Sequence, residues 1–527
     1  MKLDESKIFK HLYSNKSSWL LFFGLSLFVF LTYLPLLQSY FVWNDDYYIY
    51  TMTKGVCSSW RQHHFLTYQI GRPLLSFLFC WQTFFTKTLQ DANLVRAITI
   101  FYICIIAYLL YLWLNIHFKN KKHSILLSLI IVTLPPFQVF ASNIGCQAVA
   151  ISILLTIGSA IIIYKYAFDY IDKKGNNIKK YFNKYSITAV VMLLISFLIY
   201  PTTTMFFWVM VGIFILNISD SNWRKNRTRI YYLLGVNIVA TLIFFLYLKI
   251  NFIIYMNGPK LGHTWTYDIV LTNNIKQKIL WFISEPLNDA LNLWNIKPSS
   301  LLALISSLII IIGIIIGIIN SLKGQSTPKL IIILIEKYAL LFSFLPLSFL
   351  PNLAAGNTDQ SSYRSILSLT CLIIILLYWS LKNILELIKT TQANKILTYF
   401  LIIICLLCTY KAHHNVMNYF VFAQELEIKY IVSAINQNEL KNYKRIHIIS
   451  PNKASLVAPQ NMKEFAGIVG LYNVVLYSLL PDLDNTKKMQ IENILKNDKF
   501  SWAHNAPPEK NEEPTLIIDL SELYYFY

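Results

Sequence analysis

The sequence predicts an all-α polytopic membrane protein with a small α/β domain at its C-terminal end, and three observations support this prediction. Of the 527 residues, 55% are hydrophobic and only 14% are charged, whereas a soluble domain carries roughly 25% charged residues. Apolar runs of about 17–22 residues recur, each close to the length of a membrane-spanning helix. Lys and Arg gather in alternate loops, as the positive-inside rule describes, so the net charge of +19 requires no nucleic-acid partner.

The apolar runs, taken in chain order, predict about eleven transmembrane helices. The N-terminal segment MKLDESKIFKHLYSNK is basic and is expected on the inner side, so the first span leads outward. The expected spans cover residues 18–40, 97–116, 124–141 and 147–165, two segments that meet at YPTTT, residues 230–250, two segments that flank LKGQSTPK, one segment before KTTQANK, and residues 396–412. In this order every basic loop falls on the inner side, which supports the topology.

The predicted membrane domain covers residues 1–412 and has two large outer loops, residues 41–95 and 251–299. In the first of these loops, GRPLLSFLFCWQTFF (residues 71–85) is apolar but too short for a span, so we expect an interfacial or re-entrant helix. Residues 413–527 form the predicted outer α/β domain. There RIHIIS and TLIIDL alternate like strands, and NMKEFAGIVGLYNVVLYSLL has a helical pattern.

Two adjacent carboxylates, Asp45 and Asp46, follow the first span directly in the stretch YFVWNDDYYIY. The C-terminal end of a helix carries partial negative charge, so helix stability does not favour acids at this position. One interpretation is that the pair ends the span in a solvated turn. The other is that one carboxylate acts as a general base, because a neighbouring carboxylate raises its pKa toward neutral.

Two arginines at the predicted outer surface are candidates for binding phosphate. In GRPL, Pro73 suits the first position of a helix, which places Arg72 beside the free backbone N–H groups of a helix N-terminus, where anions bind. Arg364, in SSYRS, lies at the outer end of a span, where the positive-inside rule disfavours a cation. For both residues the alternative is a contact with lipid headgroups.

The outer loop of residues 251–299 is rich in aromatic and charged side chains that suit a sugar. Rings stack on the apolar face of a sugar, and carboxylates accept hydrogen bonds from its hydroxyls. Lys260, His263 and Glu285 are the candidate substrate-binding residues of this loop. The alternative is that the aromatic residues there belong to a membrane interface. The sequence contains no P-loop, GxSxG or HExxH motif.

The stretches NDDYY…GRPLLSF and YPTTTMFFW together resemble the serotype-converting O-antigen glucosyltransferases of bacteria and their phages. These enzymes belong to the GT-C membrane glycosyltransferases. The corresponding stretches of that family tend to read DD-[YW], then GRPL, then YQP. Tyr200 matches the last motif and becomes a candidate substrate-binding residue. Pro201 follows Tyr200 directly, so a polar contact from the Gln of that motif cannot be carried over to this chain.

The resemblance implies an enzyme of the bacterial inner membrane that moves a hexose, glucose in that family, from undecaprenyl phosphate to the O-antigen of lipopolysaccharide on the periplasmic side. It also implies two functional partners, a flippase for the lipid-linked sugar and a synthase that makes it. Asp45 or Asp46 would take the proton of the acceptor hydroxyl, and Arg72 and Arg364 would stabilise the departing phosphate. Paired carboxylates also suit a divalent metal, but the resemblance favours a reaction without a cofactor.

Other functional classes share some of these features. A transporter or flippase for lipid-linked sugars is expected to have charged residues within its spans and broken helices in paired halves. An O-antigen polymerase or ligase also has a large outer loop with arginines, but it gives no reason for the Asp45–Asp46 pair. A structural protein without catalysis is the third alternative. The polar groups of this sequence lie mainly on one side, which favours a one-sided enzyme.

Overall fold

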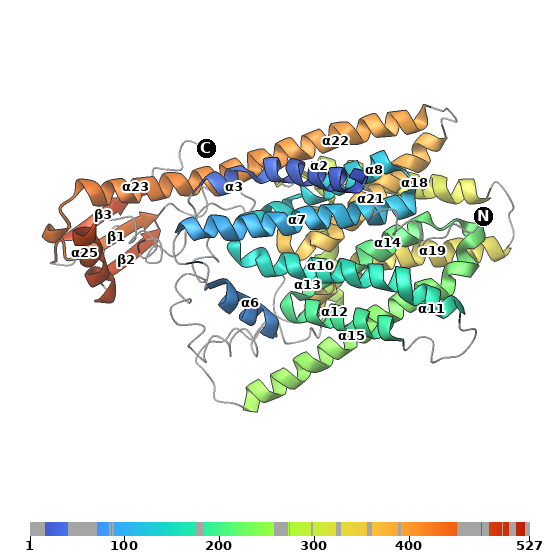
Figure 1. Ribbon diagram of the computed structural model, residues 1–527, viewed down its shortest axis with the longest axis horizontal. Coiled ribbons are helices and arrows are strands. Elements are labelled where there is room, and N and C mark those ends of the chain that lie inside the picture. Colours follow the sequence, from blue (N-terminus) through green and yellow to red (C-terminus); the bar gives the residue numbers. More distant parts are fainter. Residues whose placement is uncertain are drawn as a thin grey trace.

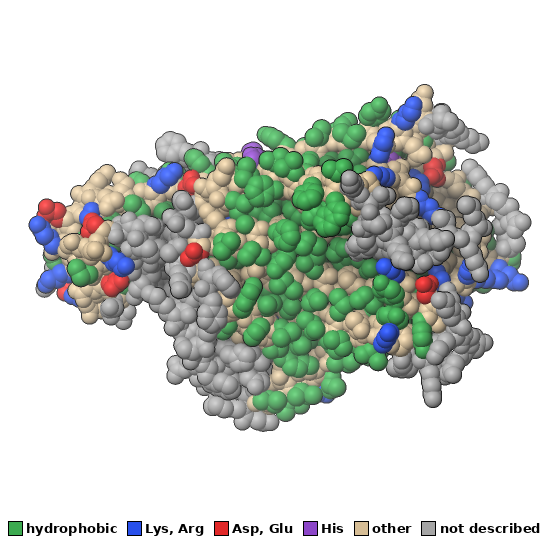
Figure 2. All heavy atoms as spheres, viewed as in Figure 1, with side chains coloured by type: hydrophobic (Ala, Val, Ile, Leu, Met, Phe, Trp, Pro, Cys, Tyr) green, Lys and Arg blue, Asp and Glu red, His purple; other side chains and the backbone are tan. Residues whose placement is uncertain are grey.

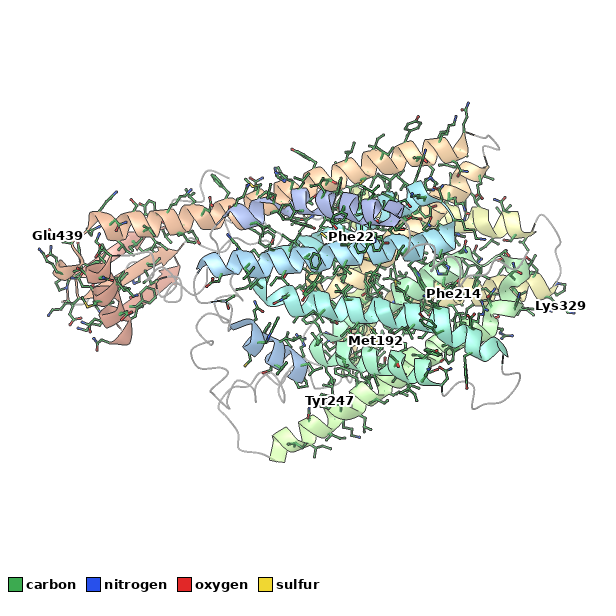
Figure 3. All side chains as sticks on the ribbon, in the orientation of Figure 1. Phe22, Met192, Phe214, Tyr247, Lys329 and Glu439 are labelled. Atoms are coloured by element: carbon green, nitrogen blue, oxygen red, sulfur yellow. The ribbon has the colours of Figure 1, made fainter. Side chains whose placement is uncertain are left out.

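The computed structural model describes residues 16–39, 71–83, 86, 89–173, 183–257, 272, 274–296, 299–322, 328–355, 361–387, 392–450, 476, 484–497, 499–504 and 513–521. Long helices run side by side along the longest axis, and a small sheet lies beyond one end of the bundle (Figure 1). We refer to that end as the sheet end and to the opposite one, where α7 and α21 finish, as the basic end. Lys329 and Glu439 mark the two extremes of the long axis (Figure 3).

The described helices have the following bounds: α2 Lys16–Tyr33, α3 Pro35–Gln38, α6 Pro73–Thr83, α7 Leu89–Phe118, α8 Lys121–Val132, α9 Pro135–Ser142, α10 Gln147–Ile162, α11 Phe168–Lys173, α12 Lys184–Ile199, α13 Pro201–Thr204, α14 Phe207–Asn217, α15 Trp223–Asn257, α16 Ile275–Ser284, α17 Pro286–Leu291, α18 Ser300–Leu322, α19 Pro328–Leu347, α20 Leu350–Ala354, α21 Tyr363–Glu386, α22 Ala393–Asn415, α23 Ala423–Gln437 and α25 Asn485–Lys496.

The molecule is a helical protein with several helices suited to a membrane. Among the described residues, 7 helices are long and apolar enough to cross a bilayer, or up to 8 if the bent pair α8–α9 counts as one span. Hydrophobic side chains cover the middle of the visible face, and Lys and Arg side chains lie toward its two ends, at the basic end and on the α/β unit (Figure 2). This distribution indicates a multi-pass membrane-embedded protein.

The expectation of about eleven spans was wrong for this structure. Three of the segments expected to span are helices of 10–17 residues, namely Ser17–Tyr33, Lys184–Ile199 and Pro201–Asn217. Pro201 accounts for two of these boundaries. It is the first residue of α13, and it restricts the preceding Tyr200, so α12 ends at Ile199. A helix of 16 residues rises only about 24 Å, which is less than the roughly 30 Å of a hydrocarbon core.

Local sequence signals explain several helix boundaries. The Asn120 side chain accepts a hydrogen bond from the backbone N–H of His123 and caps α8. Ser362 and Ser365 form a capping box at the start of α21. Between α8 and α9 the chain bends by 57°, and Pro135 and Pro136 open the second half. Proline removes a backbone donor and restricts the preceding residue, so the break falls where the sequence places it.

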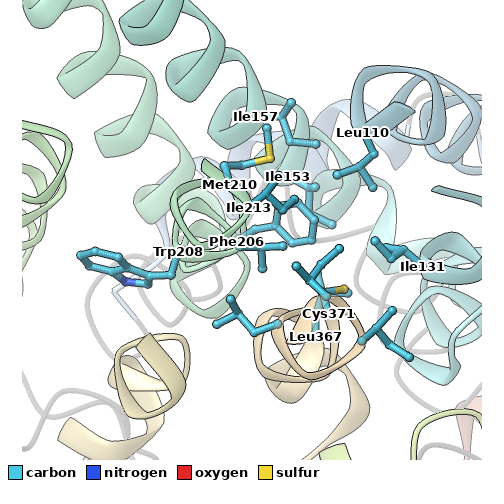
Figure 4. Close-up of a cluster of buried hydrophobic side chains, with 14 of the residues drawn as sticks. Leu110, Ile131, Ile153, Ile157, Phe206, Trp208, Met210, Ile213, Leu367 and Cys371 are labelled. Atoms are coloured by element: carbon cyan, nitrogen blue, oxygen red, sulfur yellow. The ribbon is translucent and has the colours of Figure 1, made fainter. Parts of the chain in front are cut away.

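Helix α21 forms the centre of the bundle. Leu367 and Cys371 of α21 lie against Phe206 from the α13–α14 connection, Ile153 of α10 and Ile131 of α8 (Figure 4), and all five are fully buried. Within a membrane, close van der Waals packing and hydrogen bonds between helices stabilise such contacts, because lipid is as apolar as the side chains themselves. The core therefore fixes α21 relative to α8, α10 and α13.

The C-terminal part forms a separate α/β unit with its own core. Strands β1 (Arg445–Ser450), β2 (Phe500–His504) and β3 (Thr515–Asp519) pair in parallel in the order β2-β1-β3. The expected strands RIHIIS and TLIIDL are thus confirmed. The helix expected over residues 461–480 lies, apart from Leu476, outside the described residues. A continuous helical run over Ala393–Gln437 crosses residue 413, the boundary taken from composition, and the second core gathers residues from Ile431 onward.

Candidate functional site

The GRPL motif lies at the sheet end, where Gly71 leads into α6. Gly71 has φ +71°, and a Cβ at this position would lie 2.3 Å from Cδ2 of Leu248 on α15. The left-handed backbone favours glycine here, and a side chain would also displace the end of Leu248. Pro73 is the first residue of α6, which confirms the predicted start of that helix. Arg72 is therefore held at a helix N-terminus by its two neighbours.

Arg72 contacts Tyr200, the residue that matches the last motif of the family resemblance. Its guanidinium carbon lies 4.6 Å from the centroid of the Tyr200 ring, within the range of a cation–π interaction. Tyr200 ends α12 in an extended conformation, with φ −152° and ψ 99°. The contact joins GRPL and YPTTT, two of the three stretches on which the family resemblance rests.

The hydroxyl groups of YPTTT hold the Tyr200 backbone in place. The Thr203 hydroxyl donates to the Tyr200 carbonyl oxygen at 2.9 Å, and Thr204 also donates to that oxygen, at 3.3 Å. Ser152 of α10 lies 2.9 Å from the Thr203 hydroxyl and 2.7 Å from the Ser196 hydroxyl. These bonds satisfy backbone groups that the proline break exposes, so Thr203 and Thr204 hold the backbone of the residue whose ring lies against Arg72.

Glu285 separates α16 from α17. Its Oε2 accepts a hydrogen bond from the indole Nε1 of Trp281 at 3.0 Å. The ammonium of Lys278 lies 4.8 Å from the Trp281 ring centroid, and Lys278 is buried. A cation, a ring and a carboxylate thus lie next to one another at the sheet end, and an acceptor for sugar hydroxyls is among them.

Asp289 of α17 is a residue that the sequence alone did not single out. The Ser361 hydroxyl donates to Asp289 Oδ2 at 3.4 Å. Burial raises the pKa of the Asp289 carboxyl to about 6; the hydrogen bond from Ser361 lowers this pKa, and repulsion by Glu285 raises it further. An acid in the stretch SEPLNDA carries no motif, so only its burial in the fold identifies it.

Arg364 is in the first turn of α21, three residues after Ser361. Helix α21 packs against both α17 and α13, and α12 packs against α6. The elements that carry Arg72, Tyr200, Glu285 and Arg364 are therefore linked by contacts at one end of the bundle.

Arg96 is a second buried group missed at the sequence level. It lies inside α7 and is fully buried. Its Nε donates to the Ser142 carbonyl at 2.9 Å, and its Nη1 donates to Asn93 Oδ1 at 3.0 Å. The available signal was a cation directly before the expected span of residues 97–116, since cations in spans are costly and mark functional or structural sites.

Four predicted site residues, Asp45, Asp46, Lys260 and His263, lie outside the described residues. Among the residues that the structure describes, no group of three or more His, Cys, Asp and Glu side chains could hold a metal ion.

Comparisons with known proteins identify no relative. No protein-family model matches the sequence, and no curated protein is significantly similar to it.

Proposed function

We propose that the protein is a membrane glycosyltransferase that moves a hexose from undecaprenyl phosphate to the O-antigen of lipopolysaccharide on the outer side of the bacterial inner membrane. One observation carries the proposal: the Arg72 guanidinium lies over the Tyr200 ring at 4.6 Å. Two motifs that are far apart in the chain thereby meet at one helix N-terminus. The combination suits the phosphate of a lipid-linked sugar, because a guanidinium and free backbone N–H groups both stabilise an anion.

The proposed reaction needs one base and a stabilised leaving group. The acceptor hydroxyl oxygen attacks the anomeric carbon, the bond from that carbon to the phosphate oxygen breaks, and the polyprenyl phosphate leaves as an anion. A carboxylate, Asp45 or Asp46, takes the proton of the acceptor hydroxyl. Arg72 and Arg364 stabilise the negative charge that develops on the phosphate. Tyr200 orients Arg72 through its ring.

The GT-C architecture and the orientation belong to the same proposal. The basic end would face the cytoplasm, and the sheet end with the α/β unit would face the periplasm. The isoprenoid tail of the donor would remain among lipids beside the bundle. In that position the phosphate and the sugar reach Arg72, and Glu285 with its neighbouring Trp281 is available to the hydroxyls of the substrate.

The test is transfer in cells that carry an acceptor polysaccharide, measured as an added hexose by mass spectrometry of that polysaccharide. At matched membrane levels we expect Asp45→Asn or Asp46→Asn to abolish the added mass. Arg72→Gln should reduce transfer by about two orders of magnitude, the usual loss for a donor to a developing oxyanion. Tyr200→Phe should retain transfer, and Tyr200→Leu should reduce it roughly fivefold through loss of the cation–π contact.

A matched control exists at the basic end, where Arg227 lies 5.4 Å from the Tyr231 ring centroid. Arg227→Gln removes the same type of contact, together with an ion pair to Glu336, away from the proposed site. It should leave transfer within about twofold of the unmodified chain, as expected for exposed pairs. Equal losses from Arg72→Gln and Arg227→Gln would contradict the proposed role of Arg72. An unmodified polysaccharide in the presence of the native chain would contradict the transferase itself.

A second candidate is a transporter of lipid-linked sugars, which the broken pair α8–α9 favours. The two halves bend by 57°, and the buried Arg96 binds the carbonyl of Ser142 at the end of α9. Broken helices and buried cations are features of transport pathways. A transporter would increase the amount of lipid-linked hexose accessible on the outer surface without adding mass to the polysaccharide, so the same cells distinguish the two functions.

A further inference from the structure

A cavity of about 350 Å³ opens at the basic end, far from the site proposed above. Its wall comes from the last residue of α7, the end of α14, the middle of α19 and the last two turns of α21. Because α7, α14 and α21 all finish here, the cavity lies at the level where apolar helices meet the polar face of a membrane. Basic side chains surround this end (Figure 2).

The inner wall of the cavity holds a buried lysine. Lys337 of α19 is 5% exposed. Its Nζ donates to the Ile218 carbonyl at 2.9 Å and to Asp220 Oδ1 at 3.1 Å. An ammonium has three N–H donors, and within the described part of the chain the third donor has no acceptor. Asp220 also accepts a hydrogen bond from Ser321, so its charge is already satisfied.

The mouth of the cavity holds a second pair of opposite charges. Lys382 and Glu386 lie one turn apart on α21, with 3.8 Å between Nζ and Oε1. This distance is too long for a hydrogen bond, and the two side chains are 40% and 54% exposed. Tyr378 and Trp379 line the wall beside them. The mouth therefore offers a cation for an anionic group, and a carboxylate with aromatic rings for a cationic one.

The charges of the wall select the ligand class. Two lysines and two carboxylates line the cavity, so the wall as a whole is neutral and carries both signs. An anionic headgroup would use the lysines and leave Glu386 without a partner. A headgroup that carries both a phosphate and an ammonium can pair with the lysines and with Glu386. On the neighbouring α19, Ile331, Ile332 and Ile335 are exposed, which gives acyl chains an apolar surface to lie against.

We propose that this cavity binds the phosphoethanolamine headgroup of a phospholipid from the leaflet at the basic end. The phosphate contacts Lys382 and the third N–H of Lys337. The ammonium contacts Glu386 and the aromatic wall. The proposal is independent of the transferase reaction, since it concerns the opposite end of the bundle and needs no catalytic residue.

The test uses the purified, delipidated full-length chain in detergent, with bound lipid counted by native mass spectrometry. Phosphatidylethanolamine and phosphatidylglycerol are added separately at equal concentrations. We expect phosphatidylethanolamine to bind at least about fivefold more tightly than phosphatidylglycerol. Of the two lipids, only phosphatidylethanolamine carries an ammonium, which can pair with Glu386. Lys382→Gln should lower its binding about tenfold. Glu386→Gln should lower its binding to the level of phosphatidylglycerol.

Lys395→Gln is the matched control, because Lys395 is an exposed lysine of α22 that does not line the cavity. It should leave lipid binding unchanged. Equal losses from Lys382→Gln and Lys395→Gln would show attraction by overall charge and overturn the proposal, as would equal binding of the two lipids. Soluble glycerophosphoethanolamine carries the same headgroup without acyl chains, so it distinguishes a lipid ligand from a soluble one. It should bind much more weakly than phosphatidylethanolamine. Equally tight binding would contradict a lipid as the ligand.

Discussion

At the residue scale, Asp289 shows how the fold controls the protonation of a side chain. Burial raises the pKa of its carboxyl to about 6 from the ordinary value of 3.8. The folded protein therefore binds this proton more tightly than the unfolded chain does, and the ionised form is the one that folding disfavours. Ionisation of Asp289 therefore lowers the free energy of unfolding. This loss is complete above about pH 6 and disappears as pH falls toward 4.

Asp289→Asn should raise thermal stability at pH 8, because asparagine keeps an acceptor for Ser361 and carries no charge. A shift of about two pKa units corresponds to at most about 3 kcal/mol. The gain in Tm over the native chain should shrink steadily between pH 7 and pH 4, as measured by thermal unfolding in detergent. Ser361→Ala should act in the opposite direction at pH 8, since it removes the bond that lowers the pKa. A gain from Asp289→Asn that is independent of pH would contradict this account.

The sequence identified some residues of the site and missed others. Arg72 was recognisable because glycine and proline flank it and local rules place such a residue at a helix N-terminus. Asp289 and Ser361 carry no such mark. Their contact depends on α17 packing against α21, and neither hydropathy nor spacing encodes a contact between separate elements. For the same reason the partner of Arg72, Tyr200, came from a family resemblance and not from residue chemistry.

At the element scale, close packing of α18 on α21 depends on two glycines in the stretch GIIIG. A Cβ at Gly313 would lie 2.4 Å from Cα of Ser380, and a Cβ at Gly317 would lie 2.8 Å from the Trp379 ring. The missing side chains let the α21 backbone approach, as in other small-residue helix interfaces. Asn383 then donates to the Gly313 carbonyl at 3.2 Å.

Gly313→Ala should destabilise the bundle, because the new methyl group meets backbone that cannot rotate away. Overpacking of this type costs about 1–3 kcal/mol. Gly235→Ala is the control, since nothing lies within 4 Å of a Cβ there, and alanine is favoured over glycine in a helix by up to about 1 kcal/mol. Thermal unfolding in detergent should show a lower Tm for the first variant and an unchanged or higher Tm for the second. Similar Tm values for both would show that α18 and α21 do not pack this closely.

At the scale of the whole molecule, the chain has two hydrophobic cores. One lies in the helical bundle, and the other lies between the sheet, α23 and α25. The long helical run over Ala393–Gln437 connects them and extends beyond the bundle (Figure 1). Separate cores predict that the α/β unit can lose its structure while the bundle keeps its own.

Ile448→Ala should unfold the α/β unit selectively. Ile448 is fully buried in the central strand β1, and removing a buried isoleucine side chain costs about 2–5 kcal/mol. Ile517→Ala is the matched control on β3, where the side chain is 49% exposed. Limited proteolysis in detergent should cut the C-terminal part of the first variant rapidly, leave its bundle intact, and spare the second variant. Equal resistance of the two variants would contradict a separate second core.

The sequence by itself determined the helical membrane class, the strands RIHIIS and TLIIDL, and the start of α6 at Pro73. These features follow from hydropathy, alternation and proline geometry, which act over a few neighbouring residues. The end of α12 at Ile199 and the bend between α8 and α9 also lie next to prolines, so they too follow local rules, although the expected spans did not use them. The tertiary structure decided which distant residues meet, among them Arg72 with Tyr200 and Asp289 with Ser361. Such contacts arise when helices pack against one another, and packing depends on the shapes of surfaces that are far apart in the chain.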